Sequence, residues 1–170
     1  IGAIAALLHV AAHSFAKASL FLTAGTIYEE YGSKKCDDVR GLAKRDALAA
    51  TLWIASFAAI SGIPPFPSFL SKFLTARACF DAGSWWLVPI FLVLLVAVLA
   101  GMGRAFMAMA FSAPASAAGG NPSLGDAHAQ RRPGWLAYAP QLLLLALLLV
   151  LGLGAAGPAR ALLEAAASCL

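Results

Sequence analysis

The chain has 170 residues, of which 61% are hydrophobic and only 12% are Asp, Glu, Lys or Arg. Because charged residues make up about 25% of an average soluble domain, this composition excludes that class and indicates a membrane protein surrounded by the lipid bilayer. The net charge of +4 does not indicate a nucleic-acid partner, since Lys and Arg concentrate in loops and no basic patch is interleaved with aromatic residues.

The first predicted element is a membrane-spanning helix over residues 2–28. A polar loop follows over residues 29–45, in which we interpret Glu29 and Glu30 as interfacial residues. Five basic residues lie in this loop: Lys34, Lys35, Arg40, Lys44 and Arg45. Because cytoplasmic loops are enriched in Lys and Arg, we place the loop in the cytoplasm. The chain opens in mid-helix at Ile1 without an initiator Met, so we expect it to be the C-terminal part of a longer polytopic protein.

The second predicted span, residues 47–82, is broken. Its apolar run is interrupted at residues 63–68, where Pro64, Pro65 and Pro67 remove three backbone N–H donors and their rings clash with the preceding turn. We therefore expect two half-helices joined at Pro64-Pro65. Non-helical backbone at membrane depth is tolerated where it is buried in protein or lines a water-filled cavity.

Two further spans are predicted over residues 85–111 and 135–157. A loop over residues 112–134 separates them, and an amphipathic tail over residues 158–170 follows the second. Arg131 and Arg132 place this second loop on the cytoplasmic side as well. Both basic loops share one side only if the broken stretch crosses the membrane once. Two complete spans around the prolines would put Arg131 and Arg132 outside, so we favour the single broken crossing.

Three titratable residues share one face of the first span. His9, His13 and Lys17 are spaced i, i+4, i+8, which places successive side chains about 6 Å apart along the helix. Such a row can pass protons through intervening water, because histidine exchanges its proton near neutral pH. Alternatively, the histidines hydrogen-bond neighbouring helices and Lys17 extends to the interface. Because Lys17 lies about eleven residues from Tyr28, which is deep for such an extension, we favour the proton path.

Lys72 follows the proline break by five residues. The ends of half-helices carry partial charges and unsatisfied backbone groups, which transporters use to hold ions near the membrane centre. An ionisable side chain at that depth costs about 3 kcal/mol or more, so it is a candidate functional residue by default. The alternative is a lysine that snorkels from the end of a short helix.

The sequence contains no paired carboxylates within a helix, no nucleophile elbow and no Gly-rich phosphate loop, so we expect no hydrolytic or redox chemistry on this chain. We also expect no cofactor and no metal. The three cysteines, Cys36, Cys79 and Cys169, are far apart and lack CxxC spacing, and His9 and His13 lack a third ligand. Any enzymatic role would be that of a non-catalytic subunit in an oxidoreductase complex.

Two motifs in order carry a family resemblance. Residues 8–22, in which Leu20-Phe21-Leu22 follows the His9, His13 and Lys17 row, resemble the H-x3-H-x3-K-x2-LFL signature of the antiporter-like proton-conducting subunits. The second motif resembles the G-x-PP signature of the same proteins and reads Gly62-Ile63-Pro64-Pro65-Phe66-Pro67-Ser68-Phe69-Leu70-Ser71-Lys72-Phe73. The family includes the large membrane subunits of respiratory complex I, the A and D subunits of the multisubunit cation/proton antiporters, and membrane subunits of group 4 hydrogenases.

The resemblance implies a fold of fourteen helices with two inverted five-helix repeats, each containing a broken helix. The chain would be the last four helices, and the first repeat's glutamate–lysine pair would lie outside it. By resemblance, Lys17 is the lysine of the central axis with His9 and His13 beside it. Lys72 is the residue at the second break that exchanges protons with one side of the membrane. Residues 101–104 and the loop and tail that follow look most like hydrogenase-4 component F, with the antiporters' D component next.

We therefore predict a proton-translocating membrane subunit of a redox-driven complex, of the group 4 hydrogenase or NADH:quinone oxidoreductase type. It would be a multi-pass protein of a bacterial or archaeal inner membrane. Its partners would be other membrane subunits and hydrophilic redox subunits that supply electrons. The alternative is a D-like component of a multisubunit sodium/proton antiporter, which would move sodium as well as protons. A third hypothesis, a structural anchor, fits poorly with three ionisable groups on one helical face.

Overall fold

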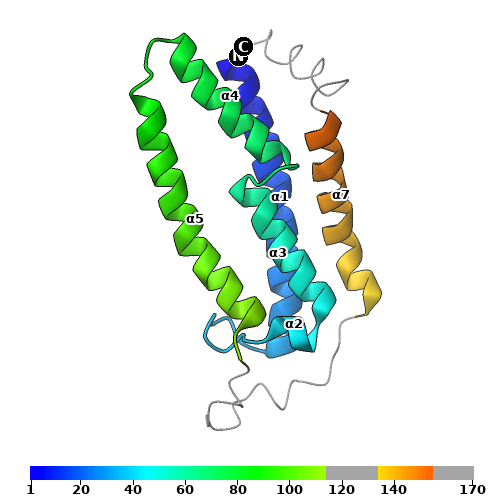
Figure 1. Cartoon of the computed structure of the whole chain (residues 1–170). Helices are drawn as coiled ribbons and strands as arrows, with labels where there is room; N and C mark the ends of the chain where they lie inside the picture. Colours follow the sequence, from blue (N-terminus) through cyan, green and yellow to red (C-terminus); the bar gives the residue numbers. More distant parts are fainter. Residues whose placement is uncertain (114–133, 155–170) are drawn as a thin grey trace.

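The computed structural model describes residues 1–113 and 134–154, and over these residues the chain forms only helices and connecting turns (Figure 1). The elements are α1 (Gly2–Tyr31), α2 (Leu42–Arg45), α3 (Ala47–Ser61), α4 (Pro67–Asp81), α5 (Leu87–Phe111), the 3-10 helix η2 (Trp135–Tyr138) and α7 (Ala139–Gly154). Within the described part, three stretches are long and apolar enough to cross a membrane: α1, α5, and η2 together with α7. The all-α membrane bundle expected from the sequence is confirmed.

Part of the predicted organisation lies outside the described residues. This holds for most of the second loop with Arg131 and Arg132, for the end of the last predicted span after residue 154, and for the tail at 158–170. The cytoplasmic placement of the two loops therefore stays a prediction, as does the assignment of the chain to the last four of fourteen helices.

The expected break in the second span lies between α3 and α4. α3 begins after Asp46, whose carboxylate accepts hydrogen bonds from the backbone N–H groups of Leu48 and Ala49 and so caps the helix. α3 ends at Gly62, which adopts the left-handed conformation (φ 79°, ψ 42°) that glycine reaches without a steric penalty. α4 starts with Pro67 in its first turn, where the N–H that proline lacks would have had no helical acceptor.

α1 is the centre of the bundle and packs against α3, α4 and α7. Three small buried residues of α1, Ala5, Ala12 and Ala16, allow the neighbouring backbones to approach closely. In Figure 1, α3 and α4 follow one another along the length of α1 and together traverse the bundle once, with α5 and α7 on opposite sides of them. We call the end of the bundle that contains α2, the end of α1 and the start of α3 the loop end.

α5 is held to α3 by aromatic contacts near the loop end. The ring of Phe106 stacks on Trp53 with ring centroids 4.3 Å apart, and it tilts against Phe57 at 4.6 Å. Towards its start, most side chains of α5 are apolar and exposed. The attachment at one end leaves room for a cavity between α5 and the α3–α4 junction.

Candidate functional site

A cavity of about 680 Å³ lies between α1, the junction of α3 with α4, and α5. The α5 side of the cavity is apolar. The polar lining comes from the other helices and consists of His9, His13, Lys17, Ser61, Lys72 and Thr75. The four side chains predicted to carry protons, three on α1 and one on α4, therefore line a single cavity.

The two histidines are stacked, and His9 is anchored to α4. The ring centroids of His9 and His13 lie 5.6 Å apart with an interplanar angle of 24°. His9 Nδ1 lies 2.9 Å from Ser71 Oγ, and the Ser71 hydroxyl donates its hydrogen to the carbonyl of Ser68 at 3.0 Å. Since a hydroxyl has one hydrogen, Ser71 accepts from His9, so Nδ1 carries the donated hydrogen. The Nε2 atom of His9 is then the ring nitrogen that can take up a further proton.

Lys72 is held by the end of the preceding half-helix. Its Nζ donates to the carbonyl of Ser61 at 2.8 Å and reaches the carbonyl of Ile60 at 3.5 Å. The last carbonyls of a helix have no intrahelical partners and carry the negative end of the helix dipole, so they stabilise an ammonium group. A Cβ at Gly62 would lie 3.0 Å from Lys72 Nζ. Glycine at this position therefore favours the left-handed turn and leaves room for the lysine beside it.

Lys17 lies in the same cavity without a fixed partner. Its side chain is exposed, and it forms no hydrogen bond or ion pair with any residue that the structure describes. Ser14, one turn after Val10, donates to the carbonyl of Val10 and is not part of the cavity lining. Lys17 and the unbonded ring nitrogens are therefore the groups in the cavity that are free to exchange protons with water.

The chemistry of the cavity follows from its lining. Among the described residues no carboxylate lines the cavity, so on this part of the chain a proton delivered there is held on a nitrogen of His9, His13, Lys17 or Lys72. Within residues 1–113 and 134–154, no group of three or more His, Cys, Asp or Glu side chains could hold a metal ion. The arrangement suits stepwise proton exchange between neighbouring nitrogens through water.

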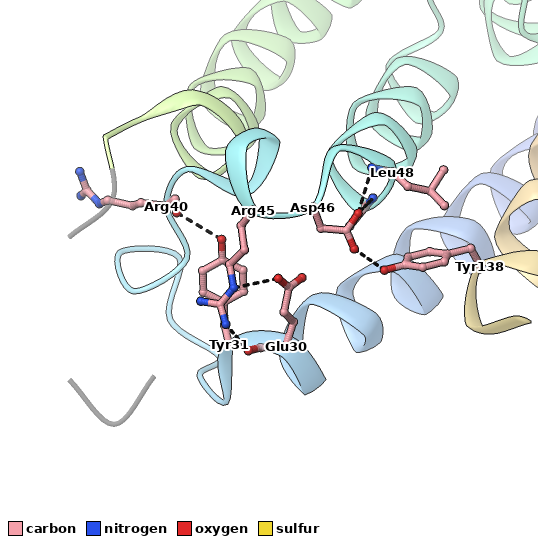
Figure 2. Close-up of polar contacts among 8 residues, drawn as sticks. Glu30, Tyr31, Arg40, Arg45, Asp46, Leu48 and Tyr138 are labelled. Carbon is pink, nitrogen blue, oxygen red and sulfur yellow. Dashed lines mark hydrogen bonds and ion pairs between the residues drawn. The ribbon is translucent and has the colours of Figure 1, made fainter. Parts of the chain in front are cut away.

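Glu30, predicted to be an interfacial residue, lies in the last turn of α1 and is packed inside the protein, and its depth in the membrane stays a prediction. Its side chain is buried, with 3% of the residue exposed, and Arg45 Nε lies 2.8 Å from Glu30 Oε1 (Figure 2). Arg45 also donates to the Glu30 backbone carbonyl at 3.1 Å and lies 4.5 Å from the centre of the Tyr31 ring. Beside this pair, the Tyr138 hydroxyl donates to the carboxylate of Asp46 (Figure 2). One feature of the sequence indicates the burial of Glu30. At helical spacing, Glu30 continues a row of polar residues that are buried in the structure.

The chain is similar to known membrane proteins over its first two spans and part of α5. Residues 1–100, more than half of the chain, match a family described as NADH:quinone oxidoreductase/Mrp antiporter, TM. NADH-quinone oxidoreductase subunit N of Desulforudis audaxviator is 37% identical over 88 residues, which cover 52% of this chain and 18% of the relative. The A component of a Na(+)/H(+) antiporter of Alkalihalophilus pseudofirmus is 39% identical over 74 residues, which cover 42% of this chain and 9% of the relative.

A solved structure extends the similarity to almost the whole chain. A chain of the Mrp complex from Dietzia sp. DQ12-45-1b superposes with a TM-score of 0.77 at 28% identity, covering 98% of this chain and 37% of that one. The chain therefore spans less than two fifths of the relatives and of the solved structure that it matches. Together with the three membrane-length helices, these matches establish a multi-pass membrane protein.

Proposed function

Because the chain belongs to the NADH:quinone oxidoreductase/Mrp antiporter transmembrane family, we propose that it is part of a proton-translocating membrane subunit of a redox-driven complex. In this proposal the chain itself performs no redox chemistry. Other membrane subunits and hydrophilic redox subunits are its partners, and changes of charge in those partners drive protons along the nitrogens that line its cavity.

One observation carries the proposal: Lys17, His13, His9 and Lys72 line one cavity at a helix break. The stacked histidines lie along α1 between Lys17 and the Ser71 contact with α4. A proton on Lys17 can move by way of water to His13 and His9, and from there to Lys72 when that amine is neutral. The carbonyls of Ile60 and Ser61 then hold the newly formed ammonium group.

A second candidate function is that of a component of a multisubunit sodium/proton antiporter without a redox partner. The superposition on the Mrp complex, which covers 98% of this chain, supports this candidate. The similarity to a NADH-quinone oxidoreductase subunit supports the first. Both candidates use the same cavity residues and differ in what drives the proton. Hydrogenase-4 component F, the subfamily that the sequence favours, stays a prediction.

The test of the proposal is Lys17→Ala in the full-length protein and the intact complex. We expect most proton translocation into vesicles to be lost while the complex still assembles, because the row loses its first nitrogen. His13→Ala is expected to do less, since water can bridge the gap that one histidine leaves. Lys44→Ala is the matched control, because Lys44 is an exposed lysine at the loop end. Normal translocation in assembled Lys17→Ala would show that Lys17 is structural.

The two candidate functions are separated by what energises the vesicles. In the redox-driven case, an electron donor and acceptor acidify or alkalinise the vesicle lumen without sodium, and Lys17→Ala abolishes this. In the antiporter case, an imposed sodium gradient moves protons without any electron donor, and Lys17→Ala abolishes that response instead.

A further inference from the structure

α7 contacts the helix break through a glycine. The buried face of α7 repeats at helical spacing and consists of Gln141, Leu145 and Leu148, which are 1%, 7% and 0% exposed. Gly152 follows Leu148 by one turn on the same face and meets the turn between α3 and α4, which reaches towards α7 in Figure 1. One face of α7 therefore extends from its hydrogen bonds at the loop end to the break.

The approach at Gly152 is too close for any side chain. A Cβ at this position would lie 2.2 Å from the carbonyl oxygen of Pro65, 3.1 Å from the backbone nitrogen of Pro67 and 3.2 Å from its Cδ. Small residues allow such approaches between membrane helices, and the Cα–H of glycine can then face a carbonyl oxygen directly. Among the described residues, no backbone N–H group donates to the Pro65 carbonyl. Gly152 is therefore the residue of α7 that covers this carbonyl.

The turn that Gly152 covers connects the two partners of the Lys72 contact. Ser61, whose carbonyl accepts from Lys72 Nζ at 2.8 Å, is the last residue of α3. Pro67 is the first residue of α4, the helix that carries Lys72. Only residues 62–66 lie between them. Because proline fixes its own φ, a displacement at Pro65 and Pro67 passes to the start of α4 and is not absorbed within the turn.

We propose that Gly152 is a positioning residue for proton translocation. By letting α7 pack directly on the Pro65 carbonyl, it holds the two half-helices at the separation at which Lys72 reaches the Ser61 carbonyl. The proposal rests on the proposed proton-translocating function and adds a residue that does not line the cavity. A side chain at position 152 collides with backbone atoms, which cannot rotate away as the end of a flexible side chain can.

The collision displaces the turn because α7 is fixed elsewhere. The buried residues Leu145 and Leu148 pack α7 into the core, and its loop end is hydrogen-bonded to α1 and α3. When the turn moves away from α7, the start of α4 moves with it, and the Lys72 ammonium group is no longer held at the Ser61 carbonyl. A change on α7 thus reaches the cavity without altering any residue that lines it.

The experiment is amine labelling of the intact complex that contains full-length Gly152→Ala. Labelling of Lys72 is followed by mass spectrometry and expressed relative to Lys17, which lines the same cavity and so reports the access of the reagent. We expect this labelling ratio to rise about fivefold, because an amine that no longer donates to the Ser61 carbonyl is free to react. Proton translocation in vesicles, per assembled complex, is expected to fall to about one fifth of the wild-type rate.

Gly154→Ala is the matched control, because a Cβ there, two residues further along α7, meets nothing within 4 Å among the described residues. It should keep both the labelling ratio and the rate. Pro67→Ala is a second variant, which serves as the test if Gly152→Ala does not assemble. It removes the Cδ beside Gly152 without a collision, alanine fits the first turn of a helix, and the labelling ratio should rise by a smaller factor.

Wild-type labelling ratios in the variants that assemble would overturn the proposal. Slower translocation without a change in the labelling ratio would also overturn it, since Gly152 would then act only on the packing of α7. A raised labelling ratio with unchanged translocation confirms that Gly152 positions Lys72 and overturns instead the part of Lys72 in the proposed function. The two failures are therefore distinguishable.

Discussion

The two faces of α1 differ in how their polar groups are satisfied. The cavity face, which comprises His9, His13 and Lys17, is partly exposed, and its lysine has no fixed partner among the described residues. The packed face, from Ser19 to Glu30, is buried and bonded to α3, α7 and Arg45. Groups that must exchange protons cannot also be locked in strong pairs. The difference therefore predicts that substitutions on the cavity side alter transport, and that substitutions among the strong pairs alter stability.

The largest effect is expected for Lys72→Arg, on the cavity side. Arginine keeps the positive charge and can still donate to the Ser61 carbonyl, but a guanidinium group does not release its proton in proteins. We expect translocation in vesicles to fall to background, with the complex assembled. Lys72→Glu is expected to retain part of the activity, because glutamate can also load and release a proton. An active Lys72→Arg with an inactive Lys72→Glu would instead identify a snorkelling lysine.

Arg45→Ala tests the packed face. It leaves the Glu30 carboxylate, whose side chain is 4% exposed, without the arginine beside it. Removing one partner of a buried pair costs about 3–5 kcal/mol, and we expect the lower end because Arg45 itself is 30% exposed. The measurement is the temperature at which the purified complex loses this protein, together with the translocation rate per surviving complex, which should not change.

Arg40→Ala is the control for this substitution. Arg40 pairs with Asp37 at 3.3 Å, with side chains 41% and 92% exposed. Exposed pairs contribute about 0–1 kcal/mol, so the control should leave the transition temperature almost unchanged. Equal thermal shifts in the two variants would contradict the burial argument for Glu30.

The extent to which the sequence predicts these features depends on how local each one is. The spacing of His9, His13 and Lys17 and the prolines of the break act within one or two helical turns, so the sequence suffices for them. The contact of Lys72 with the Ser61 carbonyl depends on how the turn at Gly62 folds the chain back. The hydrogen bond from Gln141 to Thr26 joins residues 115 positions apart and depends on where α7 docks. No periodicity within a single helix carries that information.

Gly62→Ala tests a position at which an effect on stability and an effect on transport are both expected. Alanine at φ 79° costs about 1–2 kcal/mol in the left-handed region. Its Cβ would also lie 3.0 Å from Lys72 Nζ and displace the ammonium group from the Ser61 carbonyl. We expect a moderate loss of thermal stability together with a lower translocation rate per complex.

Gly83→Ala separates the two effects of the Gly62 substitution. Gly83 has φ 73°, but a Cβ there meets nothing within 4 Å among the described residues. The control should therefore lose similar stability without a change in transport. If both variants translocate equally well, the close approach of Lys72 to Gly62 does not affect the translocation rate.

The smallest effect is expected for Ser71→Ala, which acts on the cavity face through a hydrogen bond. Ser71 accepts from His9 Nδ1 and donates to the Ser68 carbonyl, so alanine frees the His9 ring to turn and to exchange its tautomer. A net hydrogen bond contributes about 1 kcal/mol, which sets the expected loss in stability. The translocation rate should fall by less than in Lys17→Ala, because water can replace the hydroxyl as acceptor. Ser14→Ala is the control, since the Ser14 hydroxyl donates only to the Val10 carbonyl of its own helix. If Ser71→Ala and Ser14→Ala translocate alike, the orientation of His9 does not limit the path, and the histidines of the cavity face act through water alone.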